Sequence, residues 1–205
     1  MCGIAGIVDL TGSAVDVAVL TRMTRAVSHR GPDGEGVSAD GPVGLGHRRL
    51  SIIDLSEAAA QPLHNEDGTL ALVYNGEIYN FRELRRELQE KGHRFRSLTD
   101  SEVLVHGYEE WGEACITRLN GMFAFALWDG SARRLWLGRD RYGVKPLYYW
   151  HRDSQFLFAS EIKALLQHPA VRVSVNPEAL LEYFTFQNQF GDATLFANVR
   201  MLPPG

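Results

Sequence analysis

The chain has 205 residues, which suits one large domain or two small ones. Hydrophobic residues make up 45% and charged residues 22%, and the net charge is −4 without a basic run, so the composition is that of a globular protein and gives no sign of a nucleic-acid or anionic-membrane partner. No apolar run is long enough to span a bilayer, no secretory signal opens the chain, and two cysteines make a disulfide framework improbable, so we expect a cytoplasmic protein.

The first eight residues are apolar and rich in β-branched side chains, which predicts a buried strand with Cys2 at its start. Initiator methionine is commonly removed before a small residue, and removal of Met1 would leave Cys2 with a thiol and a free α-amine. A free α-amine has a pKa of about 7.7–8.0, so it can take the thiol proton and later give it to a leaving amine. The alternative is a buried cysteine that acts only as a small apolar residue.

Apolar residues at helical spacing predict an amphipathic helix over residues 16–29. Three glycines and a proline within residues 29–36 predict a loop. Residues 43–47 and 50–55 are typical of strands on either side of a polar His-Arg-Arg segment.

Residues 70–74 predict another apolar strand, which we expect to end in an Asn75-Gly76 turn and resume at residues 77–79. Two capping boxes follow, each pairing an N-cap residue with an acid three positions later: Asn80 with Glu83, and Thr99 with Glu102. The first is expected to open a helix over residues 81–91 that ends at Gly92, and the second a helix that runs to Trp111.

Strands dominate the second half of the chain. Two hairpins are expected, pairing residues 122–129 with 135–139 and residues 147–150 with 156–159. A polar loop over residues 139–146 connects them, and short helices are expected over residues 161–167 and 177–186, the second with Asn176 as its N-cap and Pro177 at its first position.

The order of these elements indicates the fold class. Strands with helices before and between them, without regular β-α-β alternation, predict an α+β layered sandwich of mostly antiparallel sheets. Two packed sheets would also explain strands that are apolar on both faces. The periodicity fades after residue 186, so we expect a domain over residues 1–190 and the start of a linker over residues 191–205.

A thiol that attacks an amide carbonyl needs a base, donors for the oxyanion and groups that position the substrate. Asn75 and Gly76 can supply a side-chain and a backbone N–H donor. Arg49 can bind a carboxylate through its fork of donors, and Asp100 can accept from an ammonium, so together they suit a free amino acid. Each has a plainer interpretation: a turn for Asn75-Gly76, a surface ion pair for Arg49, and a helix-start contact for Asp100. Only the set favours catalysis.

Several motifs together resemble the class II glutamine amidotransferase domain, most closely the glutaminase half of glutamine-hydrolysing asparagine synthetases. They are MCGI at residues 1–4, HRGPD at 29–33, RLSIID at 49–54, YNGEIYN at 74–80, DSEV at 100–103 and RDRYGVKPL at 139–147. The resemblance covers essentially the whole chain. It implies the N-terminal-nucleophile hydrolase fold, a four-layer αββα sandwich.

The resemblance also implies roles for individual residues. Cys2 would attack the glutamine side-chain amide with its own α-amine as general base, and Asn75 and Gly76 would form the oxyanion hole. Arg49 would hold the substrate α-carboxylate and Asp100 the α-ammonium. Further residues expected to line the glutamine pocket are Leu50, Ser51, Ile52, Ile53 and Glu77. Water would then hydrolyse the γ-glutamyl thioester to glutamate, with ammonia already released.

L-Glutamine is the expected partner, together with a C-terminal synthetase domain of the same polypeptide that uses ATP and magnesium to convert aspartate and ammonia to asparagine, AMP and diphosphate. This chain has no glycine-rich phosphate loop, so we expect no cofactor within it. Its seven histidines are scattered and its two cysteines lack spaced partners, so we expect no metal site. The chain could form a homodimer.

Three alternatives remain open: a related ATP-dependent amidotransferase with another acceptor, a thiol amidohydrolase that cleaves a different amide, and a regulatory module that has lost activity. Arg49 with Asp100 argues against the second alternative, because together they ask for a free amino acid. The filled catalytic positions argue against the third. Acceptor specificity would lie outside these 205 residues.

Overall fold

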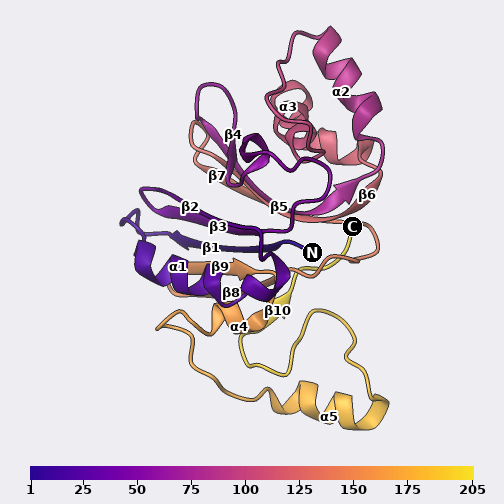
Figure 1. The fold of residues 1–205 in the computed structure, drawn as a ribbon. Helices are drawn as coiled ribbons and strands as arrows, with labels where there is room; N and C mark the ends of the chain where they lie inside the picture. Colours follow the sequence, from indigo (N-terminus) through magenta and orange to yellow (C-terminus); the bar gives the residue numbers. More distant parts are fainter.

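Two antiparallel β-sheets stack face to face in the computed structural model, which describes residues 1–205 (Figure 1). The six-stranded sheet has the order β10 (Val199–Met201), β8 (Tyr148–Arg152), β9 (Gln155–Ala159), β1 (Gly3–Asp9), β3 (Val43–Arg49) and β2 (Gly34–Asp40). The four-stranded sheet has the order β4 (Leu63–His64), β5 (Leu70–Ile78), β6 (Gly121–Asp129) and β7 (Arg134–Arg139). Both expected hairpins, β6–β7 and β8–β9, are confirmed.

Helices form the two outer layers. The six-stranded sheet packs on α1 (Val17–Arg25) and α4 (Ile162–Leu165), and the four-stranded sheet on α2 (Phe81–Glu90) and α3 (Glu102–Trp111). The fifth helix, α5 (Pro177–Phe186), projects from the body (Figure 1). Short 3-10 turns occupy Ser28–Arg30, Glu57–Ala59 and Gly112–Arg118. None of the helices combines the length and the apolar character needed to cross a membrane.

Three apolar clusters fill the three spaces between the four layers. One joins α1 and α4 to the six-stranded sheet, with Met23 at its centre, and another joins α2 and α3 to the four-stranded sheet around Phe125. The third lies between the two sheets and contains Val73 and Phe158. The expected αββα sandwich is therefore confirmed, and it explains why the central strands are apolar on both faces.

The alternation of side chains along the strands decides which groups meet between the sheets. On β5, Tyr74 packs in the cluster on the helix side, whereas Val73 packs between the sheets, so Asn75 follows Val73 on the inner face. On β1, Ile4 packs between the sheets, and Cys2 lies two residues before it, on the same face. The two strands thus direct Cys2 and Asn75 into one space.

The expected turn at Asn75-Gly76 is wrong, because β5 runs unbroken through it and pairs these two residues with Ala124 and Phe123 of β6. A Cβ on Gly76 would lie 2.4 Å from the carbonyl oxygen of Met122. The glycine therefore permits a close approach of strands. Full burial of each Leu or Phe side chain in this region is worth about 1.5–3 kcal/mol, which outweighs a local turn preference.

Residues 29–55 also differ from expectation at two places. The loop expected over residues 29–36 is shorter, because β2 begins at Gly34 and pairs with β3. The strand expected over residues 50–55 does not form, because β3 ends at Arg49 and the next residues bend away without a strand partner. Ile52 is consequently 74% exposed.

Both capping boxes are wrong, because distant backbone groups capture the side chains. Asn80 accepts from the N–H of Asn120 at 2.9 Å and donates to the Arg118 carbonyl at 3.0 Å, so it does not cap α2. The Glu102 carboxylate accepts from the backbone N–H groups of Arg96 at 2.7 Å and Ser97 at 2.9 Å. Helix α3 starts after Ser101 without a side-chain cap.

The remaining helices keep their expected positions with shorter ends. Asp16 caps α1, which ends at Arg25 instead of continuing to residue 29, and α4 covers only part of residues 161–167. Helix α5 has the expected bounds, and the Asn176 side chain accepts from the N–H of Ala179 at 3.3 Å. Strand β10 lies within residues 191–205, the stretch expected to begin a linker, and pairs with β8.

Candidate active site

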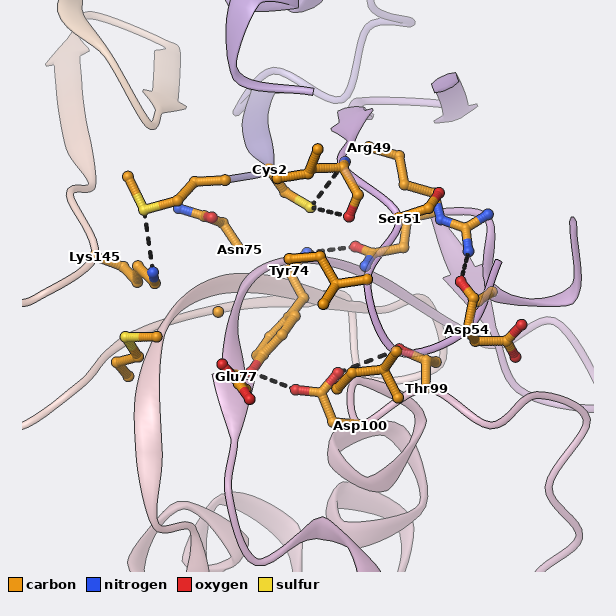
Figure 2. Close-up of a pocket in the computed structure, with 18 residues that line it drawn as sticks. Cys2, Arg49, Ser51, Asp54, Tyr74, Asn75, Glu77, Thr99, Asp100 and Lys145 are labelled. Atoms are coloured by element: carbon orange, nitrogen blue, oxygen red, sulfur yellow. Dashed lines mark hydrogen bonds between the residues drawn. The ribbon is translucent and has the colours of Figure 1, made fainter. Parts of the chain in front are cut away.

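A pocket opens at the end of the sandwich where Cys2 faces β5 (Figure 2). Its cavity of about 190 Å³ is smaller than the roughly 300–1,000 Å³ typical of drug-sized ligands, so it suits a small metabolite. It brings together all the predicted site residues: Cys2, Arg49, Leu50, Ser51, Ile52, Ile53, Asn75, Gly76, Glu77 and Asp100. Residues not predicted for the site also line it: Met1, Asp54, Ala59, Gln61, Tyr74, Thr99, Met122 and Lys145.

The Cys2 thiol lies against the backbone of Leu50, whose N–H is 3.4 Å and whose carbonyl oxygen is 3.7 Å from Sγ. Burial raises the pKa of the thiol, and the hydrogen bond from Leu50 opposes part of that effect. The Cys2 carbonyl accepts from Arg30 Nε at 2.9 Å, which fixes the backbone at the nucleophile. A thiol with a raised pKa needs a base before it can attack.

Met1 carries the α-amine of the chain as described, and its side chain lines the pocket. Its Sδ lies 3.1 Å from Nζ of Lys145, a buried lysine whose pKa is lowered by burial. Removal of Met1 would transfer the α-amine to Cys2 and would vacate this corner of the pocket.

Asn75 is 1% exposed, and its side-chain Nδ2 is buried without a hydrogen-bond partner. A buried donor left unpaired costs roughly 1–3 kcal/mol, so such groups are rare in a folded protein. Figure 2 shows Asn75 beside Cys2 in the pocket. The amide is therefore a free donor at the place where an oxyanion would form next to the thiol.

Arg49 lies at the end of β3 and donates to two carbonyls of the following loop, that of Ser56 at 2.8 Å and that of Asp54. It forms no ion pair, so the interpretation as a surface salt bridge is wrong. A guanidinium has five N–H donors. The two carbonyl contacts orient the group and leave donors for a carboxylate. The loop is itself anchored, because Asp54 Oδ2 accepts from the N–H of Leu98 at 2.7 Å.

Asp100 is 5% exposed and bonds to β5, not to the start of α3. Its Oδ2 accepts from the N–H of Ile78 at 2.8 Å and from the Tyr74 hydroxyl at 3.1 Å, and its Oδ1 accepts from Thr99 Oγ1 at 3.2 Å. Burial raises the pKa of Asp100, and these hydrogen bonds oppose the rise. The contact with the helix start is thus not the role of this carboxylate, and Oδ1 keeps a lone pair for a cation.

The sequence did not indicate Tyr74 as a site residue, because the Tyr74 side chain points to the face of β5 opposite to that of Asn75. Its ring passes on the helix side and its hydroxyl reaches Asp100 from there, as Figure 2 shows. Lys145 stands in the predicted polar loop over residues 139–146, but nothing in that segment indicated contact with the N-terminus. The only signal was the clustering of charge in that loop.

Comparison with known proteins identifies the family of this chain. A family model described as a glutamine amidotransferase domain matches residues 1–205. The chain belongs to this family. Among relatives, asparagine synthetase [glutamine-hydrolyzing] 3 of Bacillus subtilis is 45% identical, over 90% of this chain and 30% of that protein. Asparagine synthetase [glutamine-hydrolyzing] 1 of the same species is 41% identical, over 100% of this chain and 33% of that protein.

This glutamine amidotransferase domain spans about a third of the length of those curated relatives. Another relative, amidase chry2 of Gibberella zeae, is 36% identical over 100% of this chain and 32% of its own length. Glutamine phosphoribosylpyrophosphate amidotransferase from B. subtilis, solved with ADP and GMP, superposes with a TM-score of 0.68 at 22% identity, covering 80% of this chain and 43% of that one. That likeness confirms the N-terminal-nucleophile hydrolase fold.

Proposed function

We propose that this domain hydrolyses L-glutamine to glutamate and ammonia through a γ-glutamyl thioester on Cys2. The observation that carries the proposal is the unpartnered Nδ2 of Asn75, buried in the pocket that also holds the Cys2 thiol. Arg49 and Asp100 lie in the same pocket and offer one group for a carboxylate and one for an ammonium. The pair suits the two ends of a free amino acid.

The proposed reaction begins after removal of Met1. The α-amine of Cys2 takes the thiol proton, and the sulfur attacks the amide carbon of glutamine. The N–H groups of Asn75 and Gly76 bind the oxyanion, a contact that strengthens as charge develops. The protonated amine then gives its proton to the departing nitrogen, which leaves as ammonia. Water attacks the thioester, and glutamate leaves as the thiol is restored.

We further propose that the ammonia passes to a synthetase domain that converts aspartate and ATP to asparagine, AMP and diphosphate. The names of the B. subtilis relatives and their greater length support this part. ATP and magnesium would act in that synthetase domain. The alternative is a related ATP-dependent amidotransferase that transfers the ammonia to an acceptor other than aspartate. We propose the cytoplasm as the location, because a free catalytic thiol persists best where thiols stay reduced.

The experiment is intact-mass spectrometry before and after incubation with a glutamine-like diazoketone, beside an ammonia-release assay. We expect a chain without Met1 that gains one adduct on Cys2 and releases ammonia from L-glutamine. N-Acetyl-glutamine, which lacks the ammonium, should be a poor substrate if Asp100 binds that group. A chain without Met1 that stays unlabelled and inactive would contradict catalysis by this chain alone.

A further inference from the structure

Two of the scattered histidines meet outside the pocket. His93 follows the C-terminal end of α2, and His106 and Glu109 lie on neighbouring turns of α3, which packs beside α2 (Figure 1). Glu109 Oε2 lies 2.8 Å from His106 Nδ1 and 3.4 Å from His93 Nδ1. The three ligand atoms fall within 4.8 Å of one another.

Each of these side chains is oriented by a second group. The other ring nitrogen of His93 faces Glu110 Oε2 at 3.3 Å, and that of His106 faces Glu102 Oε1 at 3.7 Å. Glu109 Oε1 accepts from Asn65 Nδ2 at 2.9 Å. Histidines that bind metals almost always direct their second N–H to a carboxylate or carbonyl, which fixes the tautomer that leaves the inner nitrogen free.

We propose that His93, His106 and Glu109 form a binding site for a divalent transition metal, with Zn²⁺ as the best match. Two imidazole nitrogens and one carboxylate oxygen are a common zinc donor set, with water in the fourth position. Zinc–ligand bonds of about 2.0–2.1 Å place tetrahedral ligand atoms about 3.4 Å apart, and the two histidine nitrogens lie 2.8 Å and 3.4 Å from Glu109 Oε2. The metal would replace the direct contact between His106 Nδ1 and Glu109 Oε2.

The charges around the cluster also suit a dication. Glu102 and Glu110 flank it, and the nearby cations already have partners: Lys91 pairs with Glu110 at 2.8 Å and Arg85 lies 3.6 Å from Glu102. His106 is 2% exposed, whereas His93 and Glu109 face the surface in part, so the site has a built inner ligand and an entry path. A bound metal would join the segment after α2 to α3.

The test is a titration of the full chain carrying Cys2→Ala with ZnCl₂, followed by calorimetry and thermal unfolding. The substitution removes the accessible thiol as a competing ligand. We expect one equivalent of zinc, and a melting temperature about 5–10 °C higher when free zinc is near 100 times its Kd. Co²⁺ in place of zinc should give the visible absorption of a tetrahedral site without sulfur.

The matched variants are His93→Ala and Glu109→Gln, both at partly exposed positions, with His151→Ala as the control on the other sheet. Either variant should lose the zinc equivalent and the rise in melting temperature, with circular dichroism to confirm the fold, and the control should keep both. Absence of binding in the Cys2→Ala chain, or equal binding in His93→Ala and Glu109→Gln, would overturn the proposal. The cluster would then be a network of ion pairs only.

Discussion

The pocket at Cys2 and the start of α3 both bury polar side chains, but they satisfy them differently. In the pocket, Asn75 Nδ2 has no partner and Asp100 Oδ1 accepts only one hydrogen bond. At α3, the Glu102 carboxylate accepts from Arg96 and twice from Ser97. The unmet hydrogen-bonding capacity of Asn75 and Asp100 is available to a ligand in the pocket, whereas the fully bonded Glu102 carboxylate supports the fold.

Five predictions sharpen this contrast, and the largest effect is expected at the nucleophile. Cys2→Ala should reduce ammonia release from glutamine to background, because no other thiol lines the pocket. Its free energy of unfolding should change by less than about 1 kcal/mol, since the hydrogen bonds of Sγ are weak ones to the Leu50 backbone. Ammonia release and urea denaturation measure the two quantities. Retained turnover would remove Cys2 from its role.

The frame should respond in the opposite way. Glu102→Ala should lower the free energy of unfolding by about 3–5 kcal/mol, because it leaves the part-buried N–H of Arg96 and the buried N–H of Ser97 unpaired. Glu110→Ala, at an exposed acid on the same helix, is the control and should cost far less, because solvent screens its pair with Lys91. Urea denaturation measures both, and equal losses would contradict the distinction.

Asn75→Ala should lower kcat by about 10²–10³, which corresponds to roughly 2.7–4 kcal/mol of transition-state stabilisation. KM should change little, because the contact is strong only once the oxyanion forms. Unlike Glu102→Ala, this change should not destabilise the fold, since it deletes an unpaired donor. A pure KM effect in steady-state kinetics would argue against the oxyanion role.

Stability should depend on pH with opposite signs for two buried histidines. Burial lowers the pKa of His47, which lies beside β5, to about 3. Its contribution to the free energy of unfolding therefore falls as the pH drops from about 6.5 toward 3. Burial also opposes the charge on His106, but its interactions with Glu102 and Glu109 raise its pKa to about 9. The contribution of His106 to the free energy of unfolding is therefore lost as the pH rises from about 6.5 to 9. Each limb has a slope of at most about 1.4 kcal/mol per pH unit. Urea denaturation across pH should show His47→Gln flattening the acid limb only.

The smallest effect is expected for Arg49→Lys, which keeps the charge but loses the planar fork. KM for glutamine should rise about tenfold, or about 1.4 kcal/mol, with kcat nearly unchanged. Arg94→Lys, at an exposed position outside the pocket, is the control and should leave KM unchanged. Unaltered KM in Arg49→Lys would exclude Arg49 from carboxylate binding.

The sequence indicated most of the fold because its apolar runs coincide with the strands that are buried on both faces. It failed where tertiary contacts override a local preference. Asn75-Gly76 is a strong turn signal, yet the pairing of β5 with β6 and the burial of both its faces keep it extended. Asn80 and Glu102 matched capping boxes, but their side chains bond to backbone groups that the local pattern could not reveal.

The candidate site was easier to predict than some strands. Motifs name Cys2, Arg49, Asn75 and Asp100, and the structure places all four around one pocket. The sequence did not assign Tyr74 and Lys145 to the site. Tyr74 reaches Asp100 from the opposite face of β5 and Lys145 comes from a distant loop, and neither arrangement produces a pattern in the sequence. The meeting of His93 with His106 was missed for the same reason.

The position of β1 in its sheet has a consequence for synthesis on the ribosome. This strand is made first, yet it pairs with β9, whose Ala159 lies opposite Ala5. At 5–20 residues per second, the ribosome needs about 8–30 s to reach that partner. The other neighbour of β1, strand β3, is made much earlier, so β1 can first pair along one edge only. The edge of β1 that faces β9 therefore stays open until most of the domain has been made.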